Sequence, residues 1–105
     1  MSNSSITTEK WAPIHPGEVL YEDFIMGFGI TQNKLANAID VPPRRINEIV
    51  HGTRRISADT APRLGRYFGV DPQFWINLQS HYDLEIQKEA IHSDLARIIP
   101  LAEVK

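Results

Sequence analysis

Apolar residues recur three and four positions apart along most of the chain, which is the spacing of amphipathic helices. The first such stretch covers residues 18–27, where Leu20 and Phe24, with Phe28 just after the stretch, are spaced four apart and Val19 and Ile25 flank them. It follows a His-Pro-Gly-Glu sequence that is typical of a helix start. We therefore expect an amphipathic helix there, with the stripe of Leu20, Phe24 and Phe28 turned inward.

A second and a third helix follow, and only Asp40 to Pro42 separate them. Thr31 is suited to cap the second helix. Pro42 and Pro43 are suited to open the third, because proline lacks the N–H group that a first helical turn leaves without a partner. The third helix should end near Gly52. The expected buried positions of the pair are Leu35, Ala36, Ile39, Ile46, Ile49 and Val50.

Ser57 can cap a fourth helix, with Leu64 and Phe68 packed inward and Gly69 as its end. The Asp71-Pro72 pair then marks the start of a fifth helix. The apolar face of this fifth helix is wide and consists of Phe74, Trp75, Leu78, Tyr82 and Ile86.

Aromatic residues on a wide helical face are divided between core and interface. We expect Phe74 and Leu78 in the core. We expect Trp75 and Tyr82 to lie at least partly at a subunit contact. In the tail beyond the fifth helix, Leu95 and Ile98 keep a helical spacing, and they are further candidates for a dimer or partner contact. The alternative is that the tail folds back onto its own subunit.

The pattern contains no alternation long enough for a convincing strand, so it predicts an all-α protein. At 105 residues, 42% of them hydrophobic and 23% charged, the chain has the composition of one ordinary globular domain. We expect a flexible segment over residues 1–12, a helical domain over 13–90 and a tail over 91–105. The chain lacks cysteine and lacks an apolar run long enough to span a membrane, which fits a protein of the reducing cytoplasm.

The charge is unevenly distributed, although the net charge is only −2. Residues 31–66 contain seven Lys or Arg against three Asp or Glu, a net charge of +4, whereas the remainder carries −6. A basic middle between acidic ends indicates one face that suits an anionic polymer.

Two helices joined by a short turn allow the second to enter the major groove of DNA while the first crosses the backbone. With its aliphatic residues inward, the third helix would present Arg44, Arg45 and Asn47 outward. Arginine pairs with guanine and asparagine with adenine, so these three could read bases. The alternative is an ordinary solvated charged face. Residues placed to contact phosphates or to orient the helix are Gln32, Lys34, Pro43, Arg54 and Arg55.

An enzyme or a metalloprotein has little support in the sequence. The four histidines are scattered and form no His-x-x-x-His pair. Ser57 is better explained as a helix cap than as a nucleophile. We therefore expect no catalytic residues, no metal and no other cofactor.

Long ordered motifs between residues 13 and 85 resemble the HigA family of antitoxins. The segments that carry the resemblance are His15–Leu20, Leu35-Ala36, Val41–Ile49, Gly52–Ala61, Phe74–Gln79 and Tyr82–Leu84. It implies a five-helix fold like that of the phage λ repressor, here with a C-terminal helical extension, and it implies a homodimer.

The resemblance also implies a function. A HigA-type protein binds operator DNA to repress its own operon, and it binds and neutralises a RelE-like HigB toxin, an mRNA-cleaving ribonuclease. On this pattern Arg44, Arg45 and Asn47 contact bases or phosphates, and Gln32 orients a phosphate. The alternative is a stand-alone helix-turn-helix transcriptional regulator of the same fold without a toxin partner.

Overall fold

The computed structural model describes residues 12–103, and all of its regular elements are helical. The all-α expectation is thereby confirmed, whereas the flexible segment expected over residues 1–12 lies almost wholly outside the described residues. The elements are α2 (Pro16–Val19), the π-helical η1 (Leu20–Ile25), α3 (Gln32–Ile39), α4 (Pro43–Val50), α5 (Thr60–Phe68), α6 (Pro72–Ala90), α7 (His92–Ala96) and the 3-10 turn η2 (Leu101–Glu103).

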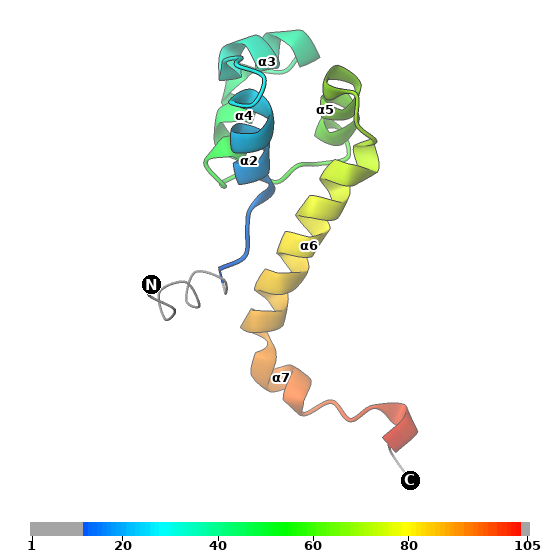
Figure 1. Cartoon of the computed structure of the whole chain (residues 1–105). Helices are drawn as coiled ribbons and strands as arrows, with labels where there is room; N and C mark the ends of the chain where they lie inside the picture. The colour runs from blue at the N-terminus through cyan, green and yellow to red at the C-terminus, as the bar shows by residue number, and fades with distance from the viewer. Residues whose placement is uncertain (1–11, 104–105) are drawn as a thin grey trace, which may run out of the picture.

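One hydrophobic core joins α2 to α5 with the first part of α6, and Figure 1 shows these elements gathered at one end of the molecule. The expected positions on α3 and α4 are confirmed, except that Val50 is only partly buried. The fully or nearly fully buried apolar residues are Leu20, Ile25, Leu35, Ala36, Ile39, Val41, Ile46, Ile49, Ile56, Ala61, Leu64 and Trp75.

The expected helix caps also form. Thr31 Oγ1 accepts a hydrogen bond from the Lys34 N–H at 3.0 Å, and Asp71 Oδ1 accepts one from the Gln73 N–H at 2.8 Å. Ser57 Oγ accepts one from the Thr60 N–H at 3.3 Å. The regular part of α5 begins only at Thr60, so Ser57 caps a looser first turn than the sequence predicts.

The first helix differs from the predicted stripe. Between Leu20 and Ile25 the chain is π-helical, and the Met26 N–H reaches back five residues to the Tyr21 carbonyl at 2.8 Å. A π turn holds more residues than an α turn, so residues four apart no longer lie above one another. Ile25 is consequently buried, whereas Phe28 is 63% exposed, and the expectation for Phe28 was wrong.

The start of α2 rests directly on α4. The His15 imidazole caps α2, because its Nδ1 accepts a hydrogen bond from the Gly17 N–H at 2.9 Å. A Cβ at Gly17 would overlap the carbonyl oxygen of Ile49, so only glycine permits this approach. Burial lowers the pKa of His15, against the opposing charges of Asp83 and Glu18. A neutral ring is also what acceptance at Nδ1 requires.

The burial of two aromatic residues of α6 differs from the expectation. Trp75 has no exposed surface and lies in the core of its own chain, whereas Phe74 is 38% exposed. Trp75 is therefore not a subunit contact, and the prediction was wrong at both positions. Leu78 is half-buried against the core, and Tyr82 is half-buried with its ring 4.9 Å from that of His15.

The second half of α6 leaves the helical domain, and α7 and η2 continue away from it (Figure 1). The radius of gyration is accordingly 17.5 Å, where a compact chain of this length would have about 13 Å. Leu95 and Ile98 are both exposed in this extension. The described tail therefore does not fold back onto its own domain.

Candidate nucleic-acid interface

The turn between α3 and α4 depends on an unusual backbone conformation. α3 ends at Asp40, which adopts a left-handed conformation with φ 61°, and Asp40 is the only residue other than glycine with a positive φ between residues 12 and 103. Aspartate tolerates this region better than most residues. The Val41 N–H then bonds the Ala36 carbonyl at 3.0 Å, and Pro42 and Pro43 start α4 at once. The two helices are thus held at a fixed angle by three residues.

α4 separates its apolar and polar sides cleanly. Ile46 and Ile49 have no exposed surface. Arg44, Asn47 and His51 follow at the spacing of one outward helical stripe, and all three are exposed. This stripe is the candidate reading surface, and it confirms the outward placement of Arg44 and Asn47.

Arg44 is the most open arginine of the surface, with 84% of its side chain exposed. Its Nε donates to Glu48 Oε2 at 3.0 Å. From the loop after α4, Arg54 Nε donates to the other oxygen, Glu48 Oε1, at 2.8 Å. We call these three residues the outer cluster. Hydrogen bonds from Arg54 and Arg44 hold the pKa of Glu48 below its usual range, so the cluster carries two positive charges and one negative charge at neutral pH.

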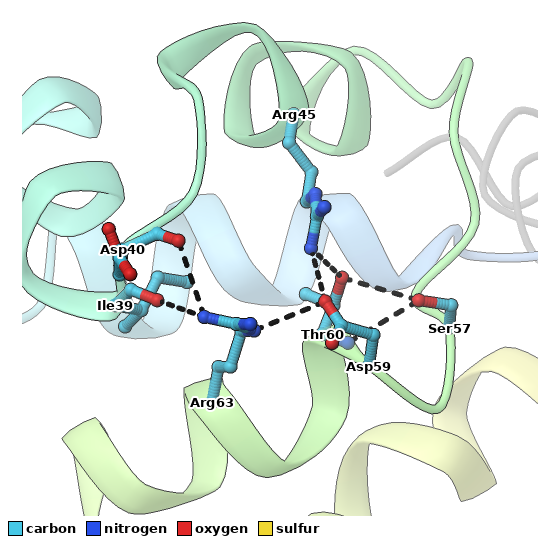
Figure 2. Close-up of polar contacts among 7 residues, drawn as sticks. All are labelled: Ile39, Asp40, Arg45, Ser57, Asp59, Thr60 and Arg63. Atoms are coloured by element: carbon cyan, nitrogen blue, oxygen red, sulfur yellow. Dashed lines mark hydrogen bonds and ion pairs between the residues drawn. The ribbon is translucent and has the colours of Figure 1, made fainter.

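Arg45 differs from Arg44, although the two are adjacent. Only 25% of its side chain is exposed. Its Nη1 donates to Asp59 Oδ2 at 2.6 Å and to Thr60 Oγ1 at 3.4 Å. Figure 2 shows the Arg45 side chain reaching from α4 to the start of α5. The outward placement expected for Arg45 is therefore corrected, because the side chain is half-buried and engaged within the protein, whereas its contact with DNA stays a prediction.

Arg63 completes this second group of charges. Its Nε donates to Asp59 Oδ2 at 3.1 Å, and its Nη1 donates to the carbonyl oxygens of Ile39 and Asp40 at 2.8 and 3.3 Å (Figure 2). We call Arg45, Asp59 and Arg63 the inner cluster. The two arginines hold the pKa of Asp59 below its usual range through their hydrogen bonds, that from Arg45 first. The inner cluster connects the end of α3, the start of α4 and the start of α5, so it stabilises the angle between the two helices of the motif.

Arg55 is also engaged, but it remains accessible. Its Nη1 donates to Asp83 Oδ2 on α6 at 2.8 Å. The buried Gln79 donates to the other Asp83 oxygen at 2.9 Å and accepts from the Ile56 N–H at 2.7 Å. These contacts fasten the loop after α4 to α6, and they fix where Arg54 and Arg55 emerge.

The remaining predicted contact residues lie where helix starts meet solvent. Gln32 and Lys34 are in the first turn of α3, with Gln32 half-buried and Lys34 exposed, and Pro43 is exposed at the first position of α4. Such positions suit contact with a phosphate backbone.

Two further residues of this face were not among the candidate contacts that the sequence suggested. His51 Nδ1 lies 2.8 Å from the Asn47 carbonyl, and since a carbonyl only accepts, the ring must donate through Nδ1 and leave Nε2 outward. The four-residue interval from Asn47 to His51 was the available signal. Glu48 was expected only as an acidic residue of the basic segment that faces away from the core, and its place between two arginines depends on a loop conformation that periodicity does not contain.

Within residues 12–103, no group of three or more His, Cys, Asp or Glu side chains could hold a metal ion. None of the helices described is both long and apolar enough to cross a lipid bilayer.

Known proteins share this fold and motif. A family model described as helix-turn-helix matches residues 26–75. Virulence-associated protein I of Dichelobacter nodosus is 49% identical over 89 residues, which cover 85% of this chain and 82% of that protein.

Two solved structures place the similarity in three dimensions. The Pseudomonas aeruginosa antitoxin HigA, solved with the higBA promoter, is 48% identical with a TM-score of 0.81, and the match covers 85% of this chain and 98% of that one. Antitoxin GraA in complex with its operator is 34% identical with a TM-score of 0.78, and the match covers 85% and 91% of the two chains. With the motif geometry above, these matches establish that the chain belongs to the HigA family of helix-turn-helix proteins.

Proposed function

We propose that this protein is the antitoxin of a HigB–HigA type toxin–antitoxin module. In this role it binds the operator of its own operon as a homodimer and represses transcription. It also neutralises an mRNA-cleaving toxin encoded beside it. Both activities belong to the cytoplasm, where the DNA and the mRNA are.

The observation that carries the DNA-binding proposal is the division of α4. Ile46 and Ile49 on its aliphatic side are fully buried, and its other side presents Arg44 and Asn47 to solvent beside Arg54 from the following loop. A guanidinium pairs with guanine and an amide pairs with adenine in the major groove. Two related antitoxins were solved with their promoter or operator, which supports DNA binding by this chain.

The homodimer proposal rests on the extension beyond the helical domain. Leu95 and Ile98 expose apolar side chains there, and so do Ile99 and Leu101. Exposed apolar groups on an extension favour burial against a second copy. A dimer would place two α4 helices in successive major grooves of a palindromic operator, with half-sites about 34 Å apart. Replacing Leu95 and Ile98 together by Asp should shift the mass in sedimentation equilibrium toward the monomer, and an unchanged mass would exclude this interface.

The direct test is a gel-shift titration of purified protein against its own promoter and against a scrambled duplex. The wild-type protein should prefer the promoter. Asn47→Ala should weaken promoter binding by about 1–3 kcal/mol if Asn47 pairs with adenine, and it should leave the scrambled duplex unaffected. Equal losses on both duplexes would make Asn47 a positioning residue only, and wild-type protein that ignores its promoter at low salt would refute the proposal.

The toxin partner is tested separately. A short basic reading frame just upstream should be toxic when expressed alone and harmless when co-expressed with this protein, and the two products should co-purify. If that frame is absent or harmless while promoter binding holds, the protein is instead a stand-alone transcriptional regulator.

A further inference from the structure

Glu48 is an acidic residue on the face that the proposed function turns toward DNA. It lies on α4 four residues after Arg44 and one after Asn47. A carboxylate beside a phosphate backbone is repelled by it, so on charge alone Glu48 weakens binding. The geometry around it supports a different role.

Both carboxylate oxygens of Glu48 accept hydrogen bonds, and each accepts from the Nε atom of a different arginine. Oε2 accepts from Arg44 Nε at 3.0 Å, and Oε1 accepts from Arg54 Nε at 2.8 Å. A guanidinium carries five N–H donors in a rigid fork. Bonding at Nε leaves the terminal Nη1 and Nη2 groups of both arginines available at the far end of the fork.

The backbone of Glu48 holds the same loop. Its carbonyl oxygen accepts from the Thr53 N–H at 2.9 Å and from Thr53 Oγ1 at 3.2 Å. The main chain of Glu48 therefore fixes the path of the loop, and its side chain fixes Arg54, which follows Thr53.

We propose that Glu48 is a positioning residue that determines the DNA sequence specificity of this protein by holding Arg44 and Arg54 with their Nη groups outward. Arg44, on the reading stripe, then has a fixed guanidinium end for the O6 and N7 atoms of a guanine, and Arg54 has one for a phosphate. Fixing two long side chains before binding removes the rotamer entropy that binding would otherwise cost. Glu48 thereby lowers the affinity for DNA of any sequence but raises the discrimination between sequences.

This inference rests on the proposed function, and the experiment separates the two. A binding site is first selected by wild-type protein from a random duplex library. Dissociation constants of wild type, Glu48→Gln and the control Glu89→Gln are then measured for the selected site and for a scrambled duplex at several salt concentrations. Glu89 is an exposed acid on the far part of α6, so the control makes the same charge change away from α4.

For Glu48→Gln we expect the ratio of specific to scrambled affinity to fall tenfold or more. The affinity for the selected site should fall, whereas the scrambled duplex should bind as tightly as before or more tightly. Glu89→Gln should leave that ratio unchanged. In an Arg44→Ala background the loss caused by Glu48→Gln should shrink to threefold or less, because Glu48 then has only Arg54 to hold. Thermal melts of all variants check that the fold is intact.

Three results would overturn the inference. The ratio could stay within twofold of wild type while both affinities rise, which would make Glu48 a simple repulsive charge. Alternatively, Glu48→Gln could lower the affinity ratio by the full amount even in the Arg44→Ala background, and the Glu48→Gln protein could select a different base from a random library. This result would make Glu48 a direct reader of a base. Wild-type protein that selects no sequence at all would overturn the proposed function and this inference together.

Discussion

Glu48 and Asp59 each accept hydrogen bonds from two arginines, but the two clusters lie in different surroundings. The outer cluster joins α4 to the loop directly after it and leaves 84% of the Arg44 side chain in solvent. The inner cluster joins α3, α4 and α5 and leaves only 25% of the Arg45 side chain exposed. The same ionic chemistry therefore serves two purposes. One cluster exposes guanidinium groups to solvent, and the other fixes the helices that carry them.

The strongest test of this contrast is Arg44→Ala. Because Arg44 is open to solvent, its loss should change the free energy of unfolding by less than about 0.5 kcal/mol. The same change should cost about 1–3 kcal/mol of affinity for the selected operator, since the proposed bidentate base contact would be lost. Urea unfolding and a binding titration on one preparation measure both quantities, and a clear loss of stability would erase the distinction between the clusters.

Arg45→Ala is the reciprocal test. It removes hydrogen bonds between a charged donor and both Asp59 and Thr60, so it should lower the free energy of unfolding by about 1–2 kcal/mol. Folded Arg45→Ala protein should keep the wild-type ratio of operator to scrambled affinity. A collapsed ratio with unchanged stability would assign Arg45 to base reading after all.

Substitutions of Asp40, whose turn the inner cluster holds, should have a smaller effect on the free energy of unfolding. The Arg63 guanidinium holds the carbonyl of this left-handed residue. Asp40→Ala should cost about 1 kcal/mol of unfolding free energy, because alanine adopts a positive φ less readily. Asp40→Gly is the matched control and should stay within about 0.5 kcal/mol of wild type. Equal losses for both variants would mean that the Asp40 side chain, and not its backbone, matters.

Acid should produce the smallest change, because Asp59 and Glu48 are both accessible to water. Their pKa values are lowered in the folded protein, so the unfolded chain takes up protons first as the pH falls. Stability from either carboxylate is therefore complete above the unfolded pKa near 4 and is lost as the pH falls through the folded value. Urea midpoints measured between about pH 5 and pH 2 should decline less steeply in Asp59→Asn and in Glu48→Gln than in wild type. An unchanged decline in either variant would show that its carboxylate does not contribute.

Much of the fold followed from local signals. Helix starts were predicted from Thr31, Asp71 and the proline pair at 42–43. These residues act through hydrogen bonds or missing donors within a few residues, and the predicted starts form in the structure. Phe28 could not be placed correctly, because one π turn changes the register of every residue after it. The burial of Trp75 and Phe74 was also predicted wrongly, because a wide apolar face does not indicate which of its sides packs against the core.

The candidate site was predictable to a lesser degree. Periodicity turned Arg44 and Asn47 outward correctly, because their neighbours Ile46 and Ile49 are buried. It could not separate Arg45 from Arg44, since the acid that binds Arg45 lies fourteen residues further along the chain. Which arginine is occupied depends on where the fold places Asp59 and Thr60, at the start of α5, relative to α4, and no spacing within α4 contains this information.

The length of α6 has a mechanical consequence. With 19 residues it is a rod about 28 Å long, so a molecule docked on the tail is held at a set distance and rotation from α4. Inserting four residues after Gln87 would lengthen this rod by about 6 Å and turn its end through roughly one full rotation. An insertion of two residues would instead leave the tail facing nearly the opposite way, and it would change the operator spacing that a paired molecule accepts without altering either reading surface.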